Sequence, residues 1–186
     1  MVSSTTRLTL EEFLALPEAD VTCEYIDGQA VPKMSPKFFH SRIQKTLLLL
    51  LDRWSEDKGR VEPEWAVKLK RNGIDWVPVP DITYISYERL SADWLLDEPC
   101  PTAPELAIEI ISPGQSFGDL TEKAMDYLNA GVSRVWVVDP QAKSITIFYA
   151  DAPPQTKKGT ATLTDSLLKG LQLTPQQIFG QAGLLD

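Results

Sequence analysis

An acidic residue stands in the middle of one of the most apolar segments of the chain. In "ELAIEIIS", residues 105–112, Glu109 has apolar neighbours on both sides. That composition predicts a buried strand, and a buried carboxylate without a partner costs several kcal/mol. A metal ion, a cationic side chain or a shifted pKa would offset that cost, so Glu109 is a candidate for a chemical role.

A second carboxylate, Asp81, lies in the preceding apolar segment, "VPVPDITYIS" at 77–86. Side chains alternate along a strand, so one register of two neighbouring strands places Asp81 and Glu109 side by side. Two carboxylates that close repel each other, which raises one pKa. A divalent cation removes the repulsion, and oxygen ligands suit Mg²⁺ or Mn²⁺. The pair therefore predicts a metal site shared by two strands.

The elements that must position these carboxylates alternate between strands and helices. Strands are expected at 23–31 (a hairpin with an Asp-Gly turn), 65–70, 77–86, 105–112, 133–140 and 143–150. The strongest helix is expected at 34–59, with Gly59 at its end and an apolar stripe of Phe39, Ile43, Leu47, Leu50 and Trp54. A second helix is expected at about 117–130, with Asp119 and Glu122 as its capping box and Gly131 following it.

Shorter elements complete the expected chain. Thr9 and Glu12 form the capping box of a short N-terminal helix. Residues 151–159 are expected to be a flexible loop, and 168–180 a covering strand or turn followed by a short helix. The helix between the strands at 105–112 and 133–140 is long enough for a parallel crossover. The order predicts an α/β protein with a mixed sheet flanked by helices.

Length and composition favour one globular domain over 1–186. We expect a core at about 36–140, an N-terminal helix and hairpin at 8–33 and a C-terminal extension at 141–186. The chain is 43% hydrophobic and has two cysteines, without a disulfide framework or thiolate metal site. It shows neither a signal peptide nor an apolar run long enough to cross a membrane, so we expect a cytoplasmic protein.

The charge distribution is uneven. The net charge is −8, which argues weakly against nucleic acid, but residues 33–71 hold ten Lys and Arg against five Asp and Glu. That segment could form a local basic surface, or its charges could simply face the solvent. Lys68 and Lys70 alternate with apolar residues and are candidates for gripping a phosphate backbone, with a solvated strand face as the plainer interpretation.

A series of short stretches in a fixed order extends the argument: "EYIDGQAVPKMSP", a histidine, "VPDITYIS", "PELAIEIISP", "DLTEKAMDYLNAGVSRVWVVDP" and "LKGLQL". This series resembles the bacterial putative restriction-endonuclease family of the PD-(D/E)XK nuclease superfamily, from about residue 8 to 180. The resemblance implies a restriction-endonuclease-like fold, with core order αβββαβ, an extra N-terminal hairpin and an extra C-terminal strand.

The resemblance also implies a catalytic set. Asp81 matches the aspartate of the motif and Glu109 the second acid, but the lysine expected two residues later is replaced by Ile111. A migrated lysine, Lys123, is implied on the following helix, and a long lysine stem could reach the strand end from there. Glu24 matches a further family acid near the site.

The implied activity is Mg²⁺- or Mn²⁺-dependent hydrolysis of phosphodiester bonds, most simply in DNA and by a homodimer. His40 matches a family histidine, and Asp81 and Glu109 would hold the metal together with the Ile110 carbonyl. Lys123 would position water or neutralise charge on the phosphate.

Each residue also has a plain structural interpretation. Glu109 could form a buried ion pair with Lys123 or an arginine, and Lys123 could pair with Asp119 on the helix surface. Asp81 could simply start a strand, Glu24 could cap or pair within the first hairpin, and His40 could hydrogen bond locally. The five tryptophans and Tyr127 are expected in the core.

Two other functions therefore stay open. The chain could be a catalytically inactive, dimeric or nucleic-acid-binding module with a nuclease fold, which Ile111 and the acidic charge favour. It could also be another metal-dependent phosphoester hydrolase, because fold resemblance does not determine chemistry.

Overall fold

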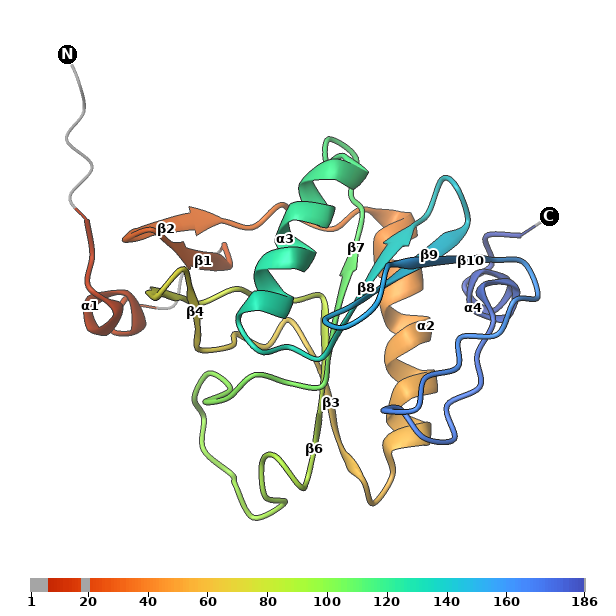
Figure 1. Ribbon diagram of the computed structural model, residues 1–186. Helices are drawn as coiled ribbons and strands as arrows, with labels where there is room; N and C mark the ends of the chain where they lie inside the picture. The colour runs from red at the N-terminus through yellow and green to blue at the C-terminus, as the bar shows by residue number, and fades with distance from the viewer. Residues whose placement is uncertain (1–6, 18–20, 186) are drawn as a thin grey trace.

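The structure, a computed structural model, describes residues 7–17 and 21–185. Its centre is a six-stranded sheet with the strand order β10-β9-β8-β7-β6-β3 (Figure 1). These strands are β3 (Gly59–Pro63), β6 (Ile82–Ser86), β7 (Leu106–Ile110), β8 (Arg134–Asp139), β9 (Ser144–Tyr149) and β10 (Gln155–Lys158). β7 and β8 are parallel and the other neighbours antiparallel, as expected because the helix α3 (Phe117–Asn129) connects β7 to β8 as a crossover.

Two helices cover the two faces of the sheet. Figure 1 shows α2 (Phe38–Ser55) and α3 (Phe117–Asn129) on either side of it. The short α1 (Leu10–Leu14) lies at the N-terminal end and α4 (Pro175–Gln181) packs beside α2. No helix in the two described ranges combines the length and apolar character needed to span a bilayer. The predicted mixed α/β sheet flanked by helices is confirmed.

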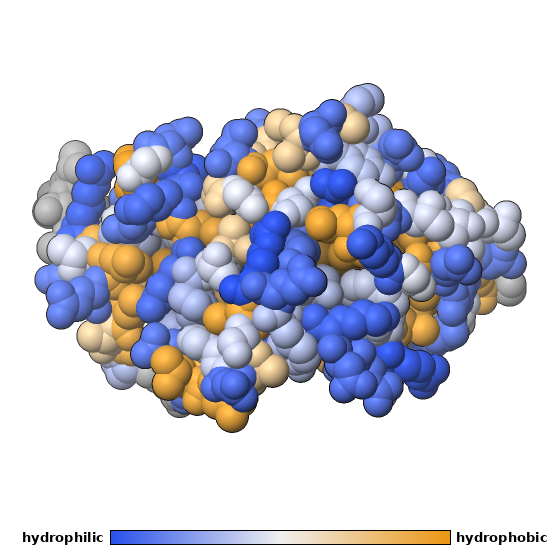
Figure 2. Space-filling model, turned by 60° about the horizontal axis from the view of Figure 1, so that its bottom comes forward, coloured by the Kyte–Doolittle hydropathy of each residue, from blue (hydrophilic) through white to orange (hydrophobic). Residues whose placement is uncertain are grey.

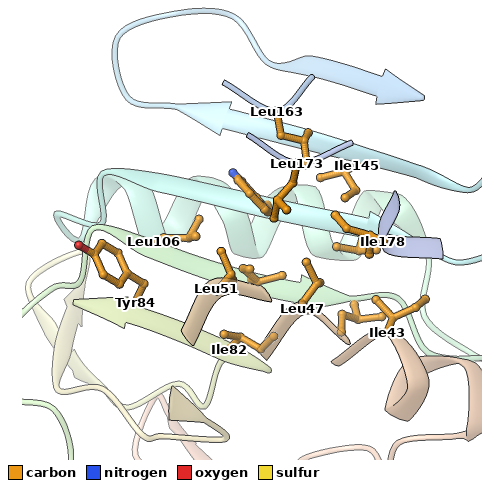
Figure 3. Packing of buried hydrophobic residues seen from close by; sticks show 14 of the residues in the cluster. Ile43, Leu47, Leu51, Ile82, Tyr84, Leu106, Ile145, Leu163, Leu173 and Ile178 are labelled. Atoms are coloured by element: carbon orange, nitrogen blue, oxygen red, sulfur yellow. The ribbon is translucent and has the colours of Figure 1, made fainter. Parts of the chain in front are cut away.

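The face under α2 is a continuous apolar core. Its fully buried helix residues Ile43, Leu47 and Leu51 follow one stripe of α2 and pack on the sheet (Figure 3). Leu163, Leu173 and Ile178 from the C-terminal segment close the same cluster. The strand residues that face them are Ile82, Tyr84, Leu106, Ile108, Ile110, Trp136, Val138, Ile145 and Ile147.

The face under α3 carries the complementary set of strand positions. Ala107, Val135 and Val137 alternate with the residues that face α2, and they pack against Leu120, Ala124, Tyr127 and Leu128 of α3. Glu109 follows Ala107 in this alternation and therefore belongs to the α3 face. A polar group thus enters an otherwise apolar layer at one end of the sheet.

Two small hairpins lie outside the main sheet. β1 (Cys23–Ile26) and β2 (Gln29–Pro32) are joined by the predicted Asp27–Gly28 turn, where both residues have positive φ. β4 (Leu69–Arg71) and β5 (Ile74–Trp76) are joined by Asn72–Gly73 in the same geometry. Isolated bridges join Tyr25 to Val77 and Val67 to Cys100.

The first strand of the core, which follows the long helix, was predicted in the wrong place. The expected strand at 65–70 forms only the bridge at Val67 and part of β4, whereas β3, which pairs with β6, lies at Gly59–Pro63. Gly59 does not end the helix, because α2 already ends at Ser55. Glycine is needed at 59 because a Cβ there would clash with the Ile85 carbonyl oxygen across the pair.

Three local expectations are also corrected. The capping box of α3 is Ser116 with Asp119, not Asp119 with Glu122, because the helix begins at Phe117. The expected loop at 151–159 contains β10, which pairs with β9. Phe39 is 55% exposed, and the buried position at this end of the stripe is taken by His40. The capping box of α1, Thr9 with Glu12, is as predicted.

Candidate active site

Asp81 and Glu109 meet at the end of the β6–β7 pair. Ile82 lies opposite Ile108 in the antiparallel register, so one further step places Asp81 opposite Glu109. The Ile110 backbone N–H donates a hydrogen bond of 2.6 Å to Asp81 Oδ2, which fixes the aspartate against β7. Both acids are buried, with 1% exposure for Asp81 and 3% for Glu109.

Glu109 receives its partners from α3. Lys123 Nζ lies 2.9 Å from Glu109 Oε1, and the Tyr127 hydroxyl donates to the same oxygen at 2.8 Å. These two residues are one helical turn apart, so both point from α3 onto the same place on β7. No hydrogen bond joins Glu109 Oε2 to any of the described residues.

Glu24 fixes the lysine from the other side. Its Oε1 accepts hydrogen bonds from Lys123 Nζ at 2.7 Å and from the Val79 backbone N–H at 2.9 Å. β1 holds Glu24 there because Tyr25 forms a backbone bridge with Val77. Lys123 is therefore held between two acids that come from different strands, and it does not pair with Asp119, which caps its own helix.

Asp81 has a separate set of partners. His40 Nε2 lies 2.9 Å from Asp81 Oδ2, and Lys33 Nζ lies 2.7 Å from Oδ1. An ionised carboxylate only accepts hydrogen bonds, so we assign the Nε2 proton to His40 as donor. His40 is in the first turn of α2 and Lys33 directly follows β2, so a helix end and a hairpin end meet at this acid.

Lys33 and its neighbours are the part of the site that sequence reasoning missed. Lys33 Nζ also contacts Glu64 Oε2 at 2.5 Å, and Gln44 Nε2 donates to Glu64 Oε1 at 2.8 Å and to the Asp81 carbonyl at 2.9 Å. Lys33 lies within "VPKMSP", one of the stretches that carry the resemblance, and Gln44 follows His40 by one helical turn. These two features of the sequence could have indicated that Lys33 and Gln44 belong to the site.

The surroundings push the pKa values of the two acids in opposite directions. Burial alone would raise the pKa of Asp81, but the hydrogen bond from His40 and the charge of Lys33 lower it to about 2. Burial raises the pKa of Glu109 to about 7, because the opposing charge of Lys123 is partly offset by Asp81 and Glu24. The lysine charges persist, since the nearby carboxylates raise the pKa of both Lys33 and Lys123 despite burial.

The donor set suits a hard divalent cation, although with few protein ligands. Four carboxylates, Glu24, Glu64, Asp81 and Glu109, face two ammonium groups, so the fully ionised cluster carries a net charge of −2. Among the described residues no three His, Cys, Asp or Glu side chains gather closely enough to hold a metal. A cation here would bind one or two carboxylates and retain waters, as Mg²⁺ commonly does.

Other residues singled out from the sequence fall in different places. Ile111, at the position where the motif has its lysine, packs with the apolar cluster under α3. The ammonium group beside Glu109 comes instead from Lys123. Lys68 lies 3.7 Å from Glu98, and Lys70 lies 2.7 Å from Asp75 in the β4–β5 hairpin, with no contact to the acidic cluster. Both are surface pairs. The face of the molecule in Figure 2 is mostly hydrophilic (blue), with apolar residues (orange) between the hydrophilic ones.

The chain is similar to known proteins in sequence and in fold. The chain matches the model of the Uma2 family, described as putative restriction endonuclease, over residues 10–176. It is also similar to the crystal structure of a putative nuclease belonging to DUF820 from Anabaena variabilis. The TM-score is 0.83 at 25% identity, covering 94% of this chain and 99% of that one.

A search of curated proteins gave no match. The predicted restriction-endonuclease-like architecture is confirmed by the family model and the solved structure together. Since the family model spans most of the sequence, from α1 to the start of α4, the chain belongs to the Uma2 family of putative restriction endonucleases.

Proposed function

We propose that this protein is a metal-dependent endonuclease that hydrolyses phosphodiester bonds in DNA. The observation that carries the proposal is the position of Lys123 Nζ, 2.9 Å from Glu109 and beside the strand end that Asp81 shares. A lysine from α3 thereby stands in for the one that Ile111 replaces in the motif. Membership of a nuclease family supports the same reaction.

Asp81 and Glu109 are the proposed metal ligands, with the Ile110 carbonyl as a third oxygen donor. When Mg²⁺ or Mn²⁺ is bound, it activates water and stabilises charge on the phosphate oxygens. When all four carboxylates are ionised, the cluster carries a net charge of −2, so a divalent cation would relieve the repulsion that the two lysines leave uncompensated.

The chain's own side chains would orient the reacting groups. Lys123, held by Glu24 and Glu109, presents a fixed positive charge that can stabilise the transition state on the phosphate. His40 and the Ile110 N–H both donate to Asp81 Oδ2, so Oδ1, which accepts from Lys33, is the oxygen that could bind a cation. Glu24 is in this view a positioning residue, because it acts through Lys123.

Plasmid nicking tests the proposal. Purified wild-type protein, Asp81→Asn and Glu109→Gln are incubated with supercoiled plasmid and Mg²⁺ or Mn²⁺, with EDTA as the metal-free reaction. We expect each substitution to lower the rate on the order of a hundredfold, the size typical of losing one charge-stabilising group. Lys70→Ala, which changes a surface pair, is the matched control and should cut like wild type.

Equal nicking by wild type and Asp81→Asn would identify a contaminating nuclease and would contradict the proposal. Activity on small phosphate esters, with none on plasmid or oligonucleotides, would instead point to another metal-dependent phosphoester hydrolase. A salt-dependent mobility shift of DNA without cleavage would favour a binding module.

One observation favours that binding module as a second candidate. Both oxygens of Asp81 already have donors, Lys33 on Oδ1 and His40 with the Ile110 N–H on Oδ2. Asp81 is thus hydrogen bonded by the protein itself, as in a site whose role is structural and not catalytic. Calorimetric titration of wild type and Asp81→Asn with Mn²⁺ separates the two, because the nuclease proposal requires binding that Asp81→Asn loses.

Assembly and compartment complete the proposal. A small nuclease that cuts both strands of a duplex most simply acts as a two-fold dimer, and light scattering of the purified protein would test this. Cys23 and Cys100 are both free, which suits a reducing compartment such as the cytoplasm, where DNA would be met.

A further inference from the structure

A pocket of about 470 Å³ opens beside the acidic cluster, between the beginnings of α2 and α3. Its walls include Lys37, Phe38 and Phe39 from the start of α2, Phe117 from the start of α3, and the turn that follows β7. Pockets that bind small organic groups typically have volumes of a few hundred Å³ and mostly apolar walls. None of the roles assigned above uses this space.

The aromatic residues of the pocket face outward. Phe38 is 70% exposed, Phe39 55% and Phe117 43%. The Phe38 and Phe39 ring centroids are 6.0 Å apart and the ring planes are tilted by 55°, so the two rings are neighbours that present faces in different directions. Exposed aromatic rings offer a stacking surface, and every nucleobase has a flat face that can stack on such a ring.

The start of α2 provides donors beside these rings. Lys37 precedes the helix and makes no side-chain capping hydrogen bond. The backbone N–H groups of Phe38, Phe39 and His40 also lack acceptors among the described residues. The first backbone hydrogen bond of the helix runs from the Ser41 N–H to the Lys37 carbonyl oxygen. Uncapped N–H groups at the start of an 18-residue helix, next to a lysine, favour a phosphate.

The pocket adjoins the candidate active site through His40. His40 lines the pocket and hydrogen bonds to Asp81 through Nε2, and its buried Nδ1 has no partner among the described residues. Ile111, another lining residue, comes two positions after Glu109. Asp139 also lines the pocket, but its Oδ1 accepts hydrogen bonds from the Gln141 and Ala142 backbone N–H groups.

From these observations we propose that the pocket binds one unpaired nucleobase of the strand being cut, with an adjacent phosphate at the start of α2. The inference rests on the proposed function and narrows its substrate: the strand must present a base outside a duplex stack. Single-stranded, frayed or mismatched DNA would then be bound more tightly than a fully paired duplex of the same length.

Fluorescence anisotropy with two labelled oligonucleotides tests the base contact. One is a thymidine 12-mer, and the other has the same phosphates but abasic tetrahydrofuran residues throughout; Ca²⁺ replaces Mg²⁺ to prevent cutting. We expect wild type to bind the thymidine 12-mer roughly tenfold more tightly, the usual size of base–aromatic stacking. The double substitution Phe38→Ala/Phe39→Ala should remove that difference without weakening the abasic complex.

Three further variants make the result specific. Phe38→Tyr/Phe39→Tyr keeps two stacking rings and should retain the preference for bases. Lys37→Ala should weaken both oligonucleotides alike, since it removes a phosphate contact. Leu95→Ala/Leu96→Ala removes two exposed apolar side chains outside the pocket and should change neither affinity.

The possible failures have different meanings. Equal wild-type affinity for the two oligonucleotides would overturn the base pocket and leave the nuclease proposal standing. No binding to either would overturn both. If Phe38→Ala/Phe39→Ala lowered the molecular mass measured by light scattering and left the base preference intact, the rings would belong to an interface between two copies, and the proposal would be wrong.

Discussion

The two carboxylates at the end of β6 and β7 are matched in position but differ in surroundings. Asp81 has donors on both oxygens, from the start of α2, the segment after β2 and the β7 backbone. Glu109 has donors on one oxygen, both from α3. The two neighbouring acids are thus held by different elements, Asp81 by the start of α2 and the segment after β2, and Glu109 by α3.

The difference shows how similar burial can produce opposite acidities. The pKa of Asp81 falls to about 2, because its hydrogen bonds and the charge of Lys33 outweigh burial. The pKa of Glu109 rises to about 7, because burial and two neighbouring acids outweigh Lys123. Carboxyl pairs whose pKa values are pushed apart are typical of sites that divide chemical roles between two acids.

The two acids should also respond differently to neutralisation, and this is the largest effect expected. Asp81→Asn leaves the buried Lys33 without one of its two carboxylates, and breaking a buried pair costs about 3–5 kcal/mol of unfolding free energy. Glu109→Gln at pH 8 should cost far less, because it removes a carboxylate whose ionisation the fold disfavours. Urea denaturation of both variants measures the contrast, and equal losses would contradict it.

The stability of the metal-free protein should depend on pH in two opposite windows. Glu109 has its ordinary pKa of 4.5 when unfolded and about 7 when folded, so its contribution is full below pH 4.5 and is lost as pH rises to 7. The loss is about 3 kcal/mol. Asp81 acts oppositely: its contribution is present above 3.8 and is lost as pH falls towards 2.

Denaturation midpoints between pH 4.5 and 8 check the first window, with Glu109→Gln as the matched control. The control should lack most of the decline that wild type shows. A decline of the same size in the control would assign it to other groups and would contradict the raised pKa of Glu109.

A smaller effect should follow from Tyr127→Phe, which removes one donor to Glu109 and leaves the ring in the core. A hydrogen bond to a charged group contributes about 2 kcal/mol. We expect a loss of that size at pH 8, where Glu109 is ionised, and a smaller loss at pH 5. Thermal unfolding at both pH values measures it; a pH-independent loss would indicate a packing defect only.

Lys70→Ala should have the smallest effect, because this substitution changes a surface ion pair outside the surroundings of the two acids. Lys70 pairs with Asp75 on the surface, with 66% and 41% of the two side chains exposed. Exposed pairs contribute at most about 1 kcal/mol. Unfolding free energy and its pH dependence should both match wild type. A change in the pH profile would mean that the two acids respond to distant charges.

Sequence reasoning succeeded where the signal is local or periodic. The buried run around Glu109, the stripe of Ile43 and Leu47, and the Asp27–Gly28 turn each appear in the order of residue types, because alternation and turn chemistry act over a few neighbours. The misplaced strand at 65–70 also alternated well. The strand that pairs with β6 is instead β3, which contains Gly59. The sequence pattern indicated a helix end at Gly59, whereas the structure needs glycine there because β3 approaches β6 closely.

The sequence by itself determined that Asp81 and Glu109 lie in neighbouring apolar segments, that Lys123 lies on a helix, and that strands and helices follow in α/β order. These features follow from the spacing of apolar residues and from the ordered motifs. Only the tertiary structure decided which charges meet. Lys33 reaches Asp81 across 48 positions and Lys123 reaches Glu24 across 99. Such pairs depend on the register of strands and the packing angle of helices, which are set by the whole core, so neither pairing is visible in any local pattern. The same holds for the burial that raises the pKa of Glu109 and for the contacts that lower the pKa of Asp81.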